Sequence, residues 1–395
     1  MHKNTILIAL ILQAALAGSS AAGEAGRPPP TQAPTQAPLP EEEITVERLA
    51  PADGNRLYVI DPAFGHMVDG RTHVLDGASG RFLGMIGTGF GALMLPSRDG
   101  RSLYAVTTYH PRLSRGPRTD VVEIHDAQSL ELKAEIDIPP RRAQGISYRS
   151  MLASSADGRF LYIQNATPAT SVGIVDLVTK KHVGEVQTPG CWSIQAWEQG
   201  YRFSAICGDG TLLTVTLDDA GQAVSRERSG KFFDPDTDPI YIHPEISGDQ
   251  RYFVSYTGNV YGVRLSGDAP AFNAPWPLLD ARDRKQAWRP GGLQISALHR
   301  ASDTLFVNMH DKGAEGTHKN PSKEIWAFDL KTRKRTARLP SNHAVSLAVS
   351  QGAQPLLYSL NLEAATVQVR RVAPGYPKVR DITGVGETSM FMEVK

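Results

Sequence analysis

The sequence predicts an all-β fold, a seven-bladed β-propeller, and three observations support it. A strand–turn–strand pattern recurs about every 50 residues, with an aspartate at each turn. A second turn between these hairpins precedes an apolar strand, so each unit holds about four strands, as a propeller blade does. Long helical periodicity is scarce, whereas 36 Gly and 27 Pro residues suit many turns. The alternatives are six or eight blades, a pair of sandwiches, or a β-helix, which usually has a shorter period.

The clearest copy of the hairpin lies at residues 173–186, which read GIVDLVTKKHVGEV. Its β-branched residues suit two strands, and the polar stretch that begins at Asp176 can hydrogen-bond its own turn backbone. Equivalent hairpins carry Asp76 and Asp126, each 50 residues from the next, and Asp329, which lies 153 residues beyond Asp176. This spacing indicates a repeat protein.

Seven hairpin-bearing units can be placed along the chain. Their outer strands are predicted near Val74, Glu123, Ile174, residues 213–215, residues 260–263, Ile325 and residues 366–369. The second turn is clearest at 97–101 and 155–159, where Asp-Gly favours a tight turn. The early strand 57–60 and the final residues 389–394 are predicted to share one blade and close the ring, which removes exposed sheet edges.

The amino-terminal region predicts export. Residues 1–22 begin with His2 and Lys3, continue with an apolar run at 6–16 that is too short to span a bilayer, and end in small residues. This layout is typical of a secretory signal peptide, with a buried core helix as the alternative. Residues 23–54 include a Pro-rich stretch and are predicted to be a disordered linker, so the propeller occupies 55–395.

The net charge is +1 with 21% charged residues, which gives no basic footprint for nucleic acid or an anionic membrane. The only two cysteines, Cys191 and Cys207, have 15 residues between them. In an oxidising compartment, two lone cysteines in neighbouring strands predict one disulfide, worth ~3 kcal/mol. A metal or redox pair is the alternative, although no CxxC motif is present.

One acidic segment resembles a calcium loop. Asp234, Asp236, Asp238 and Glu245 occupy positions 1, 3, 5 and 12, but Pro239 stands where such a loop needs glycine. A Pro-stiffened loop between blades is therefore the favoured interpretation. The histidines show no zinc pattern, so no metal ligands are assigned.

The glycine-rich residues 87–91 lack the Lys-Ser/Thr of a phosphate loop and predict a tight inter-strand turn. No catalytic serine, histidine and aspartate arrangement or paired carboxylate is legible, so no catalytic residue is assigned. The residues alone favour a propeller scaffold. A ligand-binding propeller without catalysis and a metal-dependent propeller hydrolase or lactonase are the other classes considered.

Long blocks in the middle of the chain carry a family resemblance. They lie at residues 107–110 with 115–123, 164–176, 190–193 with 206–210, 288–292 with 298–301, and 315–319. Together these blocks resemble the large (heavy) subunit of the tryptophan tryptophylquinone amine dehydrogenases, over residues 55–395. Around Tyr109 and Asn165 the sequence is more similar to the aromatic (aralkyl) amine dehydrogenases than to the methylamine enzymes.

The resemblance implies a periplasmic enzyme of two large and two small subunits that oxidatively deaminates primary amines. The tryptophan tryptophylquinone cofactor would be made from two Trp of the small subunit, so this chain would bind no cofactor. Electrons would pass to a blue copper protein, azurin or amicyanin. The resemblance also implies a Cys191–Cys207 disulfide and places Phe90 at the substrate channel, with ordinary blade packing as the alternative for Phe90.

Overall fold

The computed structural model describes residues 45–145 and 147–395. The predicted signal peptide, residues 1–22, and most of the predicted linker lie outside the described residues. Val46–Lys395 form one unit. In it, Leu49 exchanges hydrogen bonds with Gln128: the Leu49 backbone N–H donates to the Gln128 carbonyl, and the Gln128 side chain donates to the Leu49 carbonyl.

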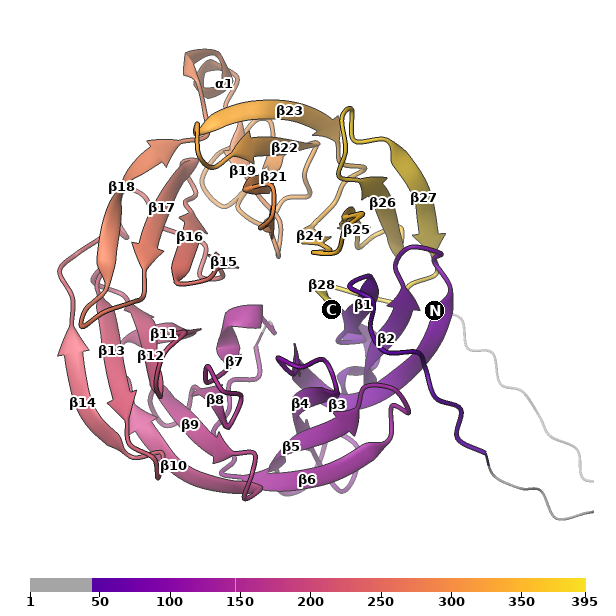
Figure 1. Ribbon diagram of the computed structural model, residues 1–395, viewed down its shortest axis with the longest axis vertical. Helices are drawn as coiled ribbons and strands as arrows, with labels where there is room; N and C mark the ends of the chain where they lie inside the picture. Colours follow the sequence, from indigo (N-terminus) through magenta and orange to yellow (C-terminus); the bar gives the residue numbers. More distant parts are fainter. Residues whose placement is uncertain (1–44, 146) are drawn as a thin grey trace, which may run out of the picture. The chain divides into compact units, whose positions relative to one another are not determined.

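The unit Val46–Lys395 is a ring of antiparallel sheets around a central axis (Figure 1). Six sheets are present in the described part of the chain, and the 7-stranded one consists of two blades that share the long strand β3. The blades therefore number seven, as predicted. Apart from the shared strand and one extra inner strand in blade 6, each blade has four strands.

The strands of each blade are given from the axis outward. Blade 1 contains β28 (Phe391–Val394), β1 (Arg56–Asp61), β2 (Gly70–Asp76) and the first half of β3 (Phe82–Pro96). Blade 2 contains the second half of β3, β4 (Ser102–Tyr109), β5 (Thr119–Asp126) and β6 (Leu132–Ile138). Blade 3 contains β7 (Leu152–Ser154), β8 (Phe160–Asn165), β9 (Ser171–Asp176) and β10 (Lys181–Gln187). Blade 4 contains β11 (Cys191–Ala196), β12 (Arg202–Cys207), β13 (Leu212–Leu217) and β14 (Ala223–Arg228).

The remaining blades follow the same order. Blade 5 contains β15 (Glu245–Ser247), β16 (Gln250–Val254), β17 (Asn259–Arg264) and β18 (Ala271–Pro277). In blade 6, β19 (Arg289–Pro290) and β20 (Ser296–His299) both pair with β21 (Thr304–His310), followed by β22 (Glu324–Asp329) and β23 (Lys334–Pro340). Blade 7 contains β24 (Ser346–Val349), β25 (Leu356–Asn361), β26 (Thr366–Arg371) and β27 (Lys378–Thr383). Three short helices are present among residues 45–145 and 147–395: η1 (Phe64–Asp69), η2 (Arg149–Met151) and α1 (Ala281–Lys285).

The two ends of the described chain close the ring in blade 1. Strand β28 pairs antiparallel with β1, with Leu57 opposite Val394 and Ile60 opposite Phe391. The predicted sharing of one blade by the first and last strands is confirmed. Because β28 is the inner strand, the carboxyl-terminal segment lies beside the axis (Figure 1).

The repeating aspartates act through their turns. Asp176 ends β9, and its carboxylate accepts hydrogen bonds from the backbone N–H groups of Val178 (2.9 Å) and Thr179 (3.1 Å). Asp76 and Asp126 make the same pair of bonds in their own turns. A short carboxylate that satisfies two turn amides fixes the reversal between adjacent strands.

One detail of the repeat prediction is wrong. The strands predicted as outer ones, such as β9 and β13, are the third of four, and a further strand pairs outside each of them. The outermost strands were overlooked because they bury little: five of the six residues of β14 are exposed. The third strands are buried on both faces and therefore carry the apolar signal.

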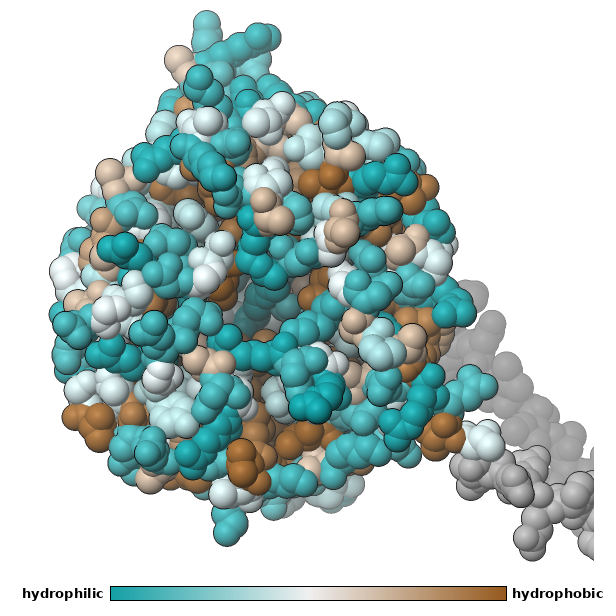
Figure 2. Space-filling model, viewed as in Figure 1, coloured by the Kyte–Doolittle hydropathy of each residue, from teal (hydrophilic) through white to brown (hydrophobic). Residues whose placement is uncertain are grey.

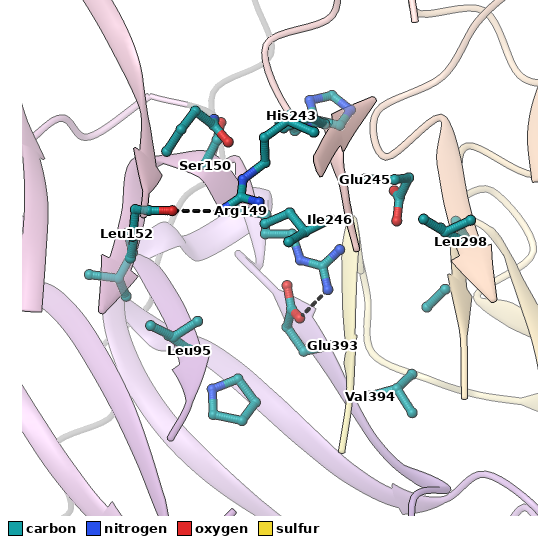
Figure 3. Close-up of a pocket in the computed structure, with 18 of the residues that line it drawn as sticks. Leu95, Arg149, Ser150, Leu152, His243, Glu245, Ile246, Leu298, Glu393 and Val394 are labelled. Carbon is teal, nitrogen blue, oxygen red and sulfur yellow. Dashed lines mark hydrogen bonds and ion pairs between the residues drawn. The ribbon is translucent and has the colours of Figure 1, made fainter. Parts of the chain in front are cut away.

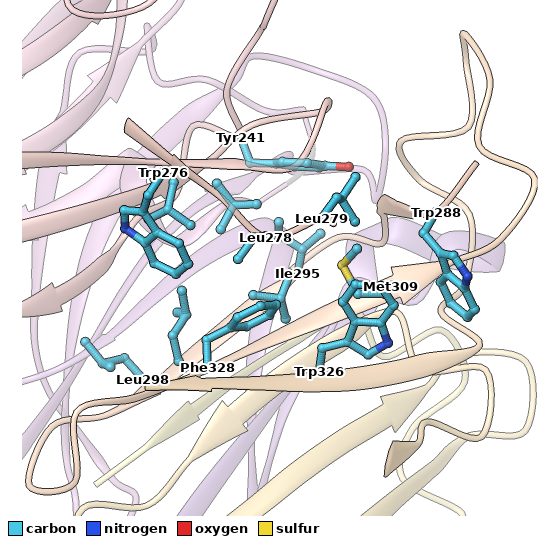
Figure 4. Packing of buried hydrophobic residues seen from close by; sticks show 14 residues of the cluster. Tyr241, Trp276, Leu278, Leu279, Trp288, Ile295, Leu298, Met309, Trp326 and Phe328 are labelled. Carbon is cyan, nitrogen blue, oxygen red and sulfur yellow. The ribbon is translucent and has the colours of Figure 1, made fainter. Parts of the chain in front are cut away.

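The core lies between neighbouring blades. Blades 5 and 6 enclose a cluster that includes Trp276, Trp288, Trp326 and Phe328, of which Trp326 is fully buried (Figure 4). The aromatic residues fill the space between adjacent sheets, where each ring buries a large apolar area. No helix in the described ranges is long and apolar enough to cross a membrane.

Candidate functional site

The candidate site is built around Phe90, where strand β3 passes from one blade to the next. Gly70 pairs with Gly89 in blade 1, whereas Phe90 pairs with Thr108 in blade 2. Phe90 therefore lies where the chain leaves the outer edge of blade 1 and becomes the inner strand of blade 2. The predicted tight turn at 87–91 is wrong, because the segment continues as a strand.

The glycines of this segment allow the crossing. Gly89 and Gly91 have φ angles of +58° and +57°, which side-chain-bearing residues rarely adopt. A Cβ on Gly89 would lie 2.8 Å from Cε1 of Tyr109 and 2.9 Å from Oγ1 of Thr107. Position 89 thus requires glycine for both its backbone conformation and its space.

A buried arginine fixes the backbone at this corner. Arg142 is 1% exposed, and its guanidinium donates to the carbonyl oxygens of Phe90 and Gly91, the latter at 2.9 Å. Its Nε donates to Oγ1 of Thr108 at 2.9 Å. Burial lowers the pKa of Arg142 to about 10, with Asp120 opposing the shift, so the guanidinium stays charged at neutral pH.

Asp120 anchors the same network from β5. It accepts two hydrogen bonds from Arg118, at 2.7 and 2.5 Å, and one from Oγ1 of Thr108 at 2.7 Å. The backbone N–H of Arg142 also donates to Asp120. Because every charged group in the network has several partners, the carbonyls beside Phe90 are held in one arrangement.

Tyr109 supports the corner from its other side. Its hydroxyl donates to Oε1 of Glu123 at 2.5 Å, and the second Glu123 oxygen lies 3.1 Å from Nε2 of His125. Burial, followed by the bond to Glu123, raises the pKa of Tyr109, so the phenol remains protonated at neutral pH.

Three exposed apolar or aromatic side chains lie in segments at the same end of blades 1 and 2 as Phe90. Phe64 is 47% exposed and belongs to η1, which packs against β3. Tyr109 (38% exposed) ends β4, and Leu113 (76%) follows in the connection to β5. We call these four residues the Phe90 patch. Clustered exposed apolar side chains on a monomer are typical of an interaction surface.

The predicted cysteine pair lies elsewhere. Cys191 and Cys207 are joined by a disulfide between the first residue of β11 and the last of β12. The two strands are neighbours in blade 4, so the disulfide links paired strands and is separate from the Phe90 corner.

The carboxylates of the calcium-like segment do not converge. Asp234 bonds its own turn, whereas Asp238 accepts hydrogen bonds from Thr257, Asn259 and Tyr261. Glu245 belongs to β15, where it accepts from Oγ of Ser296. Within residues 45–145 and 147–395, no group of three or more His, Cys, Asp or Glu side chains is placed to hold a metal ion.

Sequence reasoning missed Arg142 and Asp120, because their partners are distant in the chain. Arg142 binds the carbonyl of Gly91 across 51 residues. Main-chain carbonyls carry no sequence signal, so only the fold reveals this contact.

Comparison with known proteins identifies the family. Residues 53–392 match the model of the methylamine dehydrogenase heavy chain (MADH) family. The chain belongs to this family. The methylamine dehydrogenase heavy chain of Methylobacillus flagellatus is 32% identical over 329 residues, which cover 82% of this chain and 81% of the relative. That of Methylophilus methylotrophus is 30% identical over 366 residues, which cover 92% and 87%.

Solved structures support the fold. The β-propeller domain of Cps50 (Swd1) from Myceliophteria thermophila superposes with a TM-score of 0.52 at 12% identity, over 82% of this chain and 95% of that chain. At this identity the likeness concerns the fold alone. This heavy-chain family member is thus a seven-bladed propeller with a rigid, apolar corner at Phe90.

Proposed function

We propose that this chain is the large subunit of a periplasmic amine dehydrogenase that acts on primary, and preferably aromatic, amines. Membership of the heavy-chain family supports the reaction class. In that reaction an amine and water yield an aldehyde and ammonia, with two electrons and two protons released. The electrons would leave one at a time to a blue copper protein, azurin or amicyanin.

The cofactor would belong to a partner chain. Four of the five Trp residues of this chain, Trp197, Trp276, Trp288 and Trp326, are buried core residues. Their packing fits a structural role and leaves the quinone to a small subunit, in an assembly of two large and two small chains. When bound, tryptophan tryptophylquinone supplies the two-electron acceptor for the amine.

The propeller would contribute a wall and a docking surface. The observation that carries this assignment is the Phe90 patch, in which half-buried Phe90 and three exposed side chains lie at one end of the blades, on a corner fixed by Arg142. An apolar, aromatic wall favours substrates that carry a ring, because ring–ring contact adds to apolar burial. The exposed Phe64 and Leu113 around it fit the core of a protein–protein interface.

The test begins with purification of the chain together with its partner. A small subunit with a visible quinone band that bleaches when tyramine is added supports the proposal. A colourless monomer without a partner overturns it and favours a propeller that binds a ligand without catalysis.

The substrate class is tested at Phe90. Phe90→Ala should lower kcat/KM for tyramine roughly tenfold and change that for methylamine little, since only the larger amine contacts the ring. Phe82→Ala is the matched control, because Phe82 is an exposed phenylalanine on the outer half of the same strand. Equal losses for both amines would contradict an aromatic preference.

A methylamine-type heavy chain is the second candidate. The relatives named above are methylamine dehydrogenase heavy chains. A wild-type enzyme that turns over methylamine faster than tyramine would favour this candidate and retain the heavy-chain assignment.

A further inference from the structure

A cavity of about 350 Å³ occupies the centre of the ring (Figure 3). All seven blades contribute to its wall, chiefly through their inner strands. The view down the ring shows a central hollow with many hydrophilic residues around it (Figure 2). A volume of this size is typical of small-molecule sites in proteins.

The cavity carries more cationic than acidic side chains. Five cationic side chains line it: Arg98, Arg149, Arg251, Arg300 and Lys395. Three carboxylate side chains line it: Glu198, Glu245 and Glu393.

Two of these acids are already paired. Arg149 binds Glu393 at 2.8 Å near the middle of the cavity (Figure 3), and Arg98 binds Glu198 at 3.1 Å. Glu245 is 7% exposed, accepts from Ser296, and has a pKa that burial raises.

Arg300 and Lys395 remain without a carboxylate within 4.0 Å in the described part of the chain. Burial lowers the pKa of Lys395, Asp99 opposes this shift, and Arg300 and Arg98 add to it. Arg300 is exposed at the cavity mouth, where partial loss of solvent contact lowers its pKa, with Arg149 as the next cause and Glu245 opposing the shift. These cations are close enough to repel one another, and a bound anion would relieve that repulsion.

Three buried polar side chains also face the cavity with unpartnered atoms. They are Oγ of Ser150, Nε of Arg251 and both ring nitrogens of His243. Ser150 and His243 are 6% exposed and Arg251 is 1% exposed. Buried donors without partners are uncommon in folded proteins and mark a place where a ligand or water completes the hydrogen bonding.

We propose that the central cavity binds a small oxyanion with two or more negative charges, such as a phosphate or a dicarboxylate. Arg300 and Lys395 would supply the principal positive charges, with Arg98 beside them at the mouth. Guanidinium groups suit this role, because their forked N–H donors match the oxygens of phosphates and carboxylates.

The site is separate from the Phe90 patch. Phe90 begins the inner half of β3, whereas Arg98 follows the end of the same strand. Arg300 follows β20 and Lys395 follows β28 in the same way, so the mouth lies at the opposite end of the blades. Occupation of the cavity therefore leaves the surface proposed for amine oxidation free.

The test is titration calorimetry on the purified chain with its partner, using inorganic phosphate and malonate as probes. Sodium chloride at matched ionic strength is the control for general screening. We expect saturable binding of one or both probes and none of chloride. Binding of phosphate alone would assign a phosphate-bearing ligand, and binding of malonate alone a dicarboxylate.

Two variants locate the site. Arg300→Gln and Lys395→Gln should each weaken binding about tenfold or more, since each removes a charge-assisted bond. Arg101→Gln is the control, because the Arg101 side chain is 86% exposed in the same turn as Arg98 but does not line the cavity. The Arg300 side chain is exposed and accounts for no hydrogen bond in the described ranges, so its loss should leave the fold intact.

Three results would overturn the proposal. The first is binding of chloride as well as the probes, which would indicate an adventitious ion only. The second is undiminished probe affinity in both Arg300→Gln and Lys395→Gln. The third is the absence of binding heat with either probe. Amine turnover is measured in parallel and should be unchanged in Arg300→Gln. Absence of anion binding would therefore leave the heavy-chain assignment intact. Absence of amine turnover would likewise leave the anion site intact.

Discussion

Arg142 and Arg251 are both buried arginines in this ring, but their surroundings differ. Each is 1% exposed, and burial lowers the pKa of each to about 10. Arg142 has a partner for every nitrogen, including Nε, which donates to Thr108. Arg251 donates from its two terminal nitrogens to backbone carbonyls, while its Nε has no partner.

The difference separates a positioning role from a binding role. A fully satisfied charge network holds one backbone arrangement, which suits the fixed corner at Phe90. The network of Arg251, in which Nε lacks a hydrogen-bond partner, lines the central cavity, where a ligand can accept that hydrogen bond. Buried charge at the blade ends is thus used in two ways within one fold.

The largest expected effect is at Arg142. Arg142→Met would leave the carbonyls of Phe90 and Gly91 without donors and remove one partner of Thr108. We expect a loss of about 3–5 kcal/mol in the free energy of unfolding, measured with denaturant. Arg141→Met is the control, because Arg141 is the adjacent, half-exposed arginine paired with Glu185; its loss should cost less than about 1 kcal/mol.

Arg251→Met should cost less than Arg142→Met, about 1–3 kcal/mol, because Arg251 is less completely bonded. Denaturant unfolding of the two variants under the same conditions gives the comparison directly. If Arg251→Met were the more destabilising, the contrast between a satisfied and an unsatisfied network would be wrong.

The next effect concerns pH and His243. Burial, and then Arg149, lowers the pKa of His243 from 6.5 to about 4. His243 stacks on Tyr148 and also faces Tyr241, both uncharged at neutral pH. Below pH 6.5, His243 binds a proton in the unfolded chain but stays neutral in the folded chain. The free energy of unfolding therefore falls as the pH drops from 6.5 to about 4. The contribution is on the order of 3 kcal/mol.

The measurement compares unfolding free energies at pH 7 and pH 4.5 in wild type and His243→Phe, which keeps the stacked ring but cannot titrate. The variant should lose less stability over this range than wild type. His66→Asn, at an exposed histidine that contacts Glu387, is the control and should behave as wild type does. Equal pH dependence in wild type and His243→Phe would contradict a neutral, buried His243.

These contrasts show which parts of the molecule the sequence can predict. The hairpin aspartates act within three residues of themselves, so Asp176 and its equivalents predicted the blades and their repeat. The outermost strands, such as β14, were missed because exposed strands have no apolar pattern. Phe90 came from a family resemblance, since one phenylalanine beside glycines has no distinguishing signal.

The charged networks could not be predicted. Arg142 acts on Gly91 across 51 residues, and Arg149 meets Glu393 across 244. The fold of blade 2 brings Arg142 to Gly91, and closure of the ring brings Arg149 to Glu393. No local sequence pattern encodes either approach. The central cavity is likewise assembled from a few residues of each of the seven blades, so it exists only in the folded chain.

The last expected effect concerns the glycine that shapes the Phe90 corner. Gly89→Ala forces a side chain onto a φ of +58° and into the space of Tyr109, whose hydroxyl is held by Glu123. We expect a loss of about 1–3 kcal/mol in unfolding free energy. Gly87→Ala is the control, because a Cβ there would meet no atom within 4 Å.

If Phe90 lines the amine pocket, Gly89→Ala should also raise KM for tyramine, since the shifted corner would displace the ring. A destabilised variant with unchanged KM would assign Gly89 to folding alone and remove the link between this corner and the substrate.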